Sequence, residues 1–139
     1  MQFPTLIRQN LDRPIIAVTI YGPHGLSLQT DALIDTGSDV TLFSCDVAHR
    51  LKIDLTGLPE LPVMTAVGPI ATYQPFELTL EIRRPPEVVR WKGRAGFLPR
   101  PMSLGILGTK GFFEFFDMNY SHRNRRVEIA ACDLFRRSP

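Results

Sequence analysis

The residues best suited to chemistry lie in the segment Leu33-Ile34-Asp35-Thr36-Gly37. Two apolar residues of high β propensity deliver an aspartate to the end of a buried strand, and the glycine then permits a tight turn. A carboxylate there loses solvation, which is unfavourable unless polar groups hold it. Gly37 lets a backbone N–H approach Asp35, while Thr36 and Ser38 place hydroxyls on either side. The pattern favours a chemical role for Asp35 over a surface charge.

A second apolar segment that ends in glycine, Gly105-Ile106-Leu107-Gly108, follows later in the chain. It predicts another buried strand. The segment Thr109 to Phe116 after it predicts a helix, with four phenylalanines directed into the core and not into a cofactor stack.

These segments together resemble the retropepsin family, the dimeric aspartic proteases that include those of retroviruses. The resemblance covers most of the chain and depends on the order and spacing of four elements. They are Arg13-Pro14 before an apolar strand, the active-site loop Ala32 to Asp39, a flap hairpin over Val63 to Thr72, and Ile106-Leu107-Gly108. The resemblance implies an all-β fold, a closed barrel of the acid-protease type with one short C-terminal helix, in which residues 1–139 form a single domain.

The same resemblance implies a role for each matching residue. Asp35 is the catalytic carboxylate, and Thr36 bonds to its counterpart across a homodimer. Gly37 presents its backbone to the substrate, and Ser38 supports the loop. Asp39 binds the peptide main chain and pairs with Arg13 of the other subunit.

The resemblance also implies a substrate cleft. Leu33, Leu42 and Ile106 line its side-chain pockets, and a turn formed by Val67, Gly68, Pro69 and Ile70 closes over the peptide. Two positions depart from the family. Thr109 stands where many relatives have a bracing arginine, with Lys110 next to it, and Pro69 removes a backbone donor from a flap that is glycine-rich in the viral enzymes.

Peptide hydrolysis by carboxylates requires a pair, because one must accept a proton while the other donates one. The chain has a single Asp-Thr-Gly. The second carboxylate must therefore come from a second copy on a two-fold axis. We expect an aspartic endopeptidase acting on peptides or proteins, without metal or cofactor, with an acidic to near-neutral optimum.

Composition and charge place further limits on the function. Hydrophobic residues make up 44% of the 139 residues and charged residues 22%, as in ordinary globular domains. A net charge of +2 is too small to indicate nucleic acid as the main partner, and no apolar run approaches the ~18 residues of a membrane span. The basic clusters His122 to Arg126 and Arg136-Arg137 are expected to be a solvated hairpin tip and tail, although an anionic partner there stays open. Without a recognisable signal peptide, a cytoplasmic location is expected.

The remaining pattern predicts mostly short strands. The expected strands are Pro14 to Ile20, Leu26 to Ile34, Val40 to Phe43, Pro62 to Val67, Ala71 to Arg83 with period two, Val88 to Trp91, Ala95 to Leu98, and a hairpin of Met118 to Tyr120 with Val127 to Ala131. A turn is expected at Gly68-Pro69, and a brief helix after Ser44. Cys45 and Cys132 are expected to be free thiols.

Three other functions are alternatives to a peptidase. A non-catalytic peptide-binding module of the same fold is the main alternative, and the departures at Thr109 and Pro69 keep it open. A phosphotransferase with an aspartate nucleophile would need an acid where Gly37 stands, and a longer chain. A metal site is disfavoured because Asp31, Asp35 and Asp39 lie on an extended segment, and His24, His49 and His122 are far apart.

Overall fold

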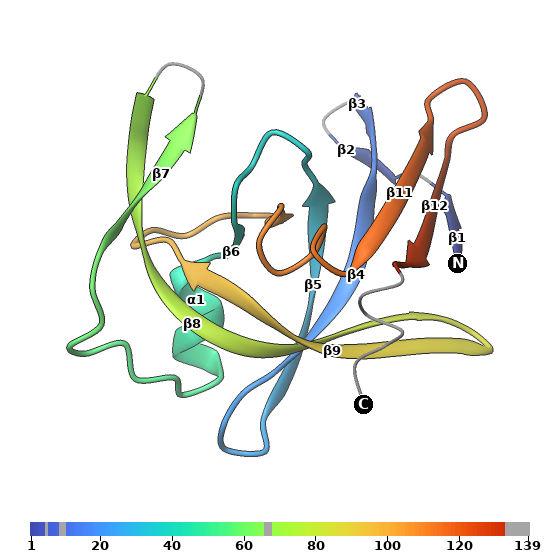
Figure 1. Ribbon diagram of the computed structural model, residues 1–139. Helices are drawn as coiled ribbons and strands as arrows, with labels where there is room; N and C mark the ends of the chain where they lie inside the picture. The colour runs from blue at the N-terminus through green and yellow to red at the C-terminus, as the bar shows by residue number, and fades with distance from the viewer. Residues whose placement is uncertain (5, 9–10, 66–67, 133–139) are drawn as a thin grey trace.

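A closed β-barrel forms the body of the protein. The computed structural model describes residues 1–4, 6–8, 11–65 and 68–132. Its largest sheet has the strand order β4-β5-β10-β6-β9-β8-β7, and β8 also pairs with β4, so that six strands close on themselves (Figure 1). The strands are β4 (Ile15–Tyr21), β5 (Ser27–Ile34), β6 (Thr41–Phe43), β7 (Leu61–Thr65), β8 (Gly68–Arg84), β9 (Glu87–Phe97) and β10 (Gly105–Leu107). The predicted mostly-β closed barrel is confirmed.

Two smaller sheets accompany the barrel. In the first, β12 (Arg126–Ala131) lies between β1 (Gln2–Pro4) and β11 (Phe116–Ser121), so the sheet joins one strand from the N-terminal end to two from the C-terminal end of the described chain. In the second, β2 (Leu6–Arg8) pairs with β3 (Leu11–Arg13). Because β11 pairs antiparallel with β12, the predicted C-terminal hairpin is confirmed. The pairing of β1 with β12 was not predicted.

Alternating side chains of the long strands fill the barrel. Val18 and Ile20 of β4 and Leu80 and Ile82 of β8 are all completely buried. Burying a side chain of this size contributes about 1.5–3 kcal/mol relative to leaving it in water. The period-two pattern read from the sequence of β8 therefore does report its inner face.

The only helix among the described residues is α1 (Cys45–Arg50), which is short and directly follows β6. It begins where expected, because the Ser44 side chain accepts a hydrogen bond from the Asp46 N–H at 3.2 Å. Val47 and Ala48 face the core. No helix in the described part of the chain is long and apolar enough to cross a membrane.

The prediction of a C-terminal helix over Thr109 to Phe116 is wrong. This segment is a series of turns that runs into β11, and the N–H groups of Phe113 and Glu114 bond to carbonyls five residues back. Gly111 has a φ of +94°, which a right-handed helix cannot contain. The expected core role of the aromatic rings is correct for Phe112, which is fully buried, and for Phe116, which is 2% exposed.

Two strand boundaries also differ from the prediction. Val88 to Trp91 and Ala95 to Leu98 are not separate strands, because β9 continues through Gly93. A side chain at Gly93 would lie 2.8 Å from the Gly111 carbonyl oxygen, so this glycine permits a close backbone approach and does not end the strand. Gly68 and Pro69 lie in β8, where they pair with Thr65 and Met64, and not in a turn.

Candidate active site

The Asp35 loop connects β5 to β6 and stands on the same side of the molecule as the β7–β8 hairpin (Figure 1). Asp35 is half-buried, whereas Thr36 and Gly37 are exposed. The Gly37 N–H donates a hydrogen bond to Asp35 Oδ1 at 2.9 Å, and the Ser38 N–H donates to the Asp35 carbonyl at 3.2 Å. The backbone contact expected from the glycine is present, and it fixes one carboxylate oxygen at the end of the strand.

Three strands bring the predicted pocket residues together. β10 lies between β5, to which it is parallel, and β6, to which it is antiparallel. In this register Ile106 is opposite Leu33 on one side and opposite Leu42 on the other. Residues opposite each other share a face of the sheet, so these three form an apolar row beside Asp35.

Backbone hydrogen bonds hold the Asp35 loop to the segment after β10. They run from Asp35 N to Leu107 O (3.0 Å), from Thr109 N to Ser38 O (2.9 Å), from Lys110 N to Asp39 O (2.9 Å) and from Thr41 N to Lys110 O (3.0 Å). In the described residues, no hydrogen bond of the Thr109 or Lys110 side chain takes part. The loop is therefore held by main-chain groups at the positions where many relatives have an arginine.

The apolar motif ends in glycine because there is no space for a side chain at Gly108. A Cβ at this position would lie 2.3 Å from the Val40 carbonyl oxygen and 2.7 Å from that of Ser38. Its N–H donates to the buried Thr41 Oγ1 at 3.1 Å. A side chain at Gly108 would push the two connected segments apart.

The base of the β7–β8 hairpin packs onto the apolar row. Val40, Leu42, Tyr73 and Leu98 form a buried cluster, against which Val63, Ala71, Met102 and Ile106 pack. The hairpin predicted to be the flap is therefore present beside the apolar row, and its role as a flap stays a prediction. Of the residues predicted for its tip, Gly68, Pro69 and Ile70 lie in β8, and Val67 lies outside the described residues.

Arg13 and Asp39 are not brought together within the chain. Arg13 ends β3 with an exposed side chain, Asp39 is also exposed, and no ion pair joins them in the described part of the structure. Thr36 has an exposed side chain too.

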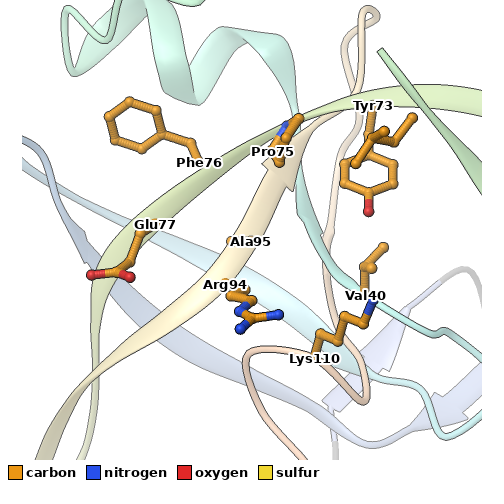
Figure 2. Close-up of a pocket in the computed structure, with 9 residues that line it drawn as sticks. Val40, Tyr73, Pro75, Phe76, Glu77, Arg94, Ala95 and Lys110 are labelled. Carbon is orange, nitrogen blue, oxygen red and sulfur yellow. The ribbon is translucent and has the colours of Figure 1, made fainter. Parts of the chain in front are cut away.

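A cavity beside the loop was missed by the sequence reading. It has a volume of about 320 Å³ and includes Val40, Tyr73, Arg94 and Lys110 in its lining (Figure 2). Arg94 is one of several cations at alternate positions of β9, a pattern visible in the sequence. Only the register of β9 and the position of Lys110 show that the two cations meet at one cavity.

Glu81 is the one buried carboxylate among the described residues, and it lies away from the Asp35 loop. Its side chain is 1% exposed and accepts hydrogen bonds from the Nε atoms of Arg83 and Arg90, the latter at 2.9 Å. Burial raises the pKa of Glu81. Hydrogen bonds from Arg83, Arg90 and Tyr21 together lower it by a larger amount, so the pKa lies below its ordinary value. This network explains how an acid is accommodated in β8. In the same described residues, no group of three or more His, Cys, Asp or Glu could hold a metal ion.

Comparison with known proteins agrees with this geometry. The chain matches the family described as aspartyl protease over residues 16–110, more than half of its length. The chain therefore belongs to the aspartyl protease family. No curated protein sequence matched.

The solved structures similar to the chain include two proteases. A retropepsin-like aspartic protease from Rickettsia conorii has 14% sequence identity and a TM-score of 0.62, with 95% of this chain and 94% of that chain covered. This likeness shows a retropepsin-like fold. The EIAV protease complexed with the inhibitor HBY-793 has 20% identity and a TM-score of 0.40, with 74% of this chain and 88% of that chain covered.

Proposed function

We propose that the chain is one half of a homodimeric aspartic endopeptidase, in which the two Asp35 carboxylates activate the water that hydrolyses a peptide bond. The observation that carries the proposal is the Asp35-Thr36-Gly37 loop, present once in a chain that belongs to the aspartyl protease family. One carboxylate cannot act as base and acid at once. A symmetric pair of chains supplies the second carboxylate.

The chemistry of the pair follows from its charge. Two carboxylates in close contact share one proton, since the second ionisation is opposed by the first charge. The ionised carboxylate removes a proton from water, and the protonated one donates to the carbonyl oxygen of the peptide. After the tetrahedral intermediate forms, a proton passes to the leaving nitrogen and the carbon–nitrogen bond breaks.

The surroundings of Asp35 supply the remaining roles. Leu33 and Ile106, which are half-buried, offer apolar surface to side chains that flank the cut bond, and the buried Leu42 packs beside Ile106. The β7–β8 hairpin covers the peptide, and Asp39 binds its main chain. Thr36 and Ser38 support the loop, and the exposed Arg13 pairs with Asp39 of the second copy.

The test compares wild-type protein with Asp35→Asn on a mixed peptide library across pH. We expect cleavage by the wild type, with a rate that falls once both carboxylates ionise, and loss of cleavage in the variant. Asp117→Asn is a matched control, because Asp117 is exposed on β11, outside the site. Full peptidase activity in Asp35→Asn would refute the proposal.

The alternative of a non-catalytic peptide-binding module gives a different result in the same experiment. It binds peptides without cleaving them at any pH, and Asp35→Asn leaves binding unchanged. Light scattering on the same samples measures the mass. A dimer is required for catalysis but not for simple binding.

A further inference from the structure

The cavity missed by the sequence reading continues the face of the proposed cleft. On β9, Gly96 is opposite Leu42 of the apolar row, and Arg94 lies two residues away on the same strand face. On β8, Tyr73 packs onto this face, because a Cβ at Gly96 would lie 2.2 Å from its ring. A peptide lying on the row therefore has this cavity at its side.

Among the described residues, two cations at the cavity have no counter-ion. Arg94 and Lys110 have exposed side chains, and neither makes an ion pair or side-chain hydrogen bond in the described part of the chain. Glu77 is opposite Arg94 in the strand register and also contributes to the lining, yet the two form no ion pair. Figure 2 shows the Glu77 carboxylate directed away from Lys110. The cavity thus has excess positive charge at one end.

A hydroxyl donor points to the same space. Tyr73 is 8% exposed, and in the described residues its hydroxyl has no hydrogen-bond partner. Figure 2 shows this hydroxyl directed from β8 toward Val40, on the side of the cavity that holds Lys110. The Tyr73 side chain lines the cavity, so a ligand in this space could accept a hydrogen bond from its hydroxyl.

We propose that this cavity binds an acidic side chain of the substrate, away from the bond that is cut. The inference rests on the proposed function and adds a substrate class to it. Arg94 and Lys110 complement the carboxylate, and Tyr73 donates a hydrogen bond to it. Val40, Leu61 and Pro75 provide apolar surface for the methylene groups of a glutamate.

The volume suits one side chain better than a longer segment. At about 320 Å³ the cavity is near the lower limit of small-molecule sites. An extended peptide advances about 3.3 Å per residue and turns alternate side chains to one face. The acidic preference should therefore be confined to one or two positions of the peptide.

The test uses peptides with an apolar pair at the cut and a glutamate moved through the flanking positions. Each peptide has glutamine and lysine counterparts. We expect the wild type to favour glutamate over glutamine by about three- to tenfold in kcat/KM at one or two positions, as for partly exposed charge pairs. The ratio should decrease at high salt, because these charges are screened.

Variants of the lining residues test whether the preference for glutamate comes from the cavity. The double variant Arg94→Gln, Lys110→Gln should bring the ratio of glutamate to glutamine close to one, and charge reversal at both positions should favour lysine. Tyr73→Phe should lower the ratio. Lys92→Gln removes the neighbouring exposed cation of β9, which does not line the cavity, and should leave the ratio unchanged.

The same peptides, labelled for fluorescence anisotropy, measure binding to Asp35→Asn protein. An acidic preference in binding, without cleavage by the wild type, supports the cavity and contradicts the peptidase proposal. Cleavage with equal rates for glutamate and glutamine at every position overturns the cavity inference alone. The cavity inference is also overturned if Lys92→Gln lowers the ratio of glutamate to glutamine as much as the double variant does. The preference would then come from the overall positive charge of the protein.

Discussion

Thr41 connects the two segments that position Asp35, and replacing it by valine isolates that connection. Valine keeps the shape of threonine but has no oxygen. Thr41 is fully buried, and its Oγ1 accepts the hydrogen bond of the Gly108 N–H at 3.1 Å. Gly108 is buried as well. The Thr41→Val change therefore leaves a donor without water or a partner.

The expected cost follows from this burial. Leaving a buried backbone donor unpaired costs about 1–3 kcal/mol, more than the net value of the hydrogen bond itself. The 3.1 Å separation is at the long end of the usual range, which favours the lower half of that interval. Urea unfolding followed by tryptophan fluorescence measures the loss, since Trp91 is buried in the core. All samples need the same protein concentration, because association raises the apparent stability.

Thr41→Ser is the matched control, because serine retains the acceptor oxygen. We expect it to lose the smaller amount that corresponds to one buried methyl group. If the free energy of unfolding of Thr41→Val lies within about 0.5 kcal/mol of the wild-type value, the Gly108 N–H is not a buried donor without a partner, and the reasoning fails. A larger loss in Thr41→Ser than in Thr41→Val would also contradict it.

Three further results are expected. Gly108→Ala should prevent folding or strongly destabilise the protein, because its Cβ would lie 2.3 Å from a backbone oxygen. At Gly57 no atom lies within 4 Å and only its φ of +81° opposes an alanine, so Gly57→Ala should cost the smaller backbone strain of about 1–2 kcal/mol. Circular dichroism would distinguish the two variants, and a fully folded Gly108→Ala would be contrary evidence. The pKa of Glu81 is lower in the folded protein than its ordinary value of 4.5, so its ionised form contributes stability at pH values above 4.5, and this stability is lost as the pH falls through the folded pKa. Glu81→Gln should therefore make the free energy of unfolding depend less on pH on the acid side, and an unchanged slope would refute this. Mixing wild-type protein with excess Asp35→Asn should lower the activity per wild-type chain, since mixed dimers have one carboxylate, and activity independent of the added variant would argue against a shared site.

Much of the fold could be predicted because the relevant signals are local. The alternation of β8 and the capping of α1 by Ser44 depend on neighbouring residues. The Asp35 loop could be recognised because its glycine has a specific role, to bring an N–H to the carboxylate.

The segment after β10 could not be predicted in the same way. Four phenylalanines at near-helical spacing favoured a helix, but the Gly111 carbonyl accepts a hydrogen bond from the distant Trp91 Nε1 at 2.7 Å. Gly111 takes a positive φ in this arrangement. The cavity at Arg94 and Lys110 was missed for a related reason, because strand register decides which distant side chains meet.

The position of β10 between β5 and β6 has a consequence for the order of folding. β5 and β6 do not pair with each other, so the loop that joins them is not tied to a completed sheet until Gly105–Leu107 enters. Contacts of such large sequence separation form late, after the loop between them has closed. During synthesis, a chain that ends before Gly105 would contain Asp35 but not the strand that holds it. We expect the carboxylate to reach its final position only after Gly105–Leu107 has been made.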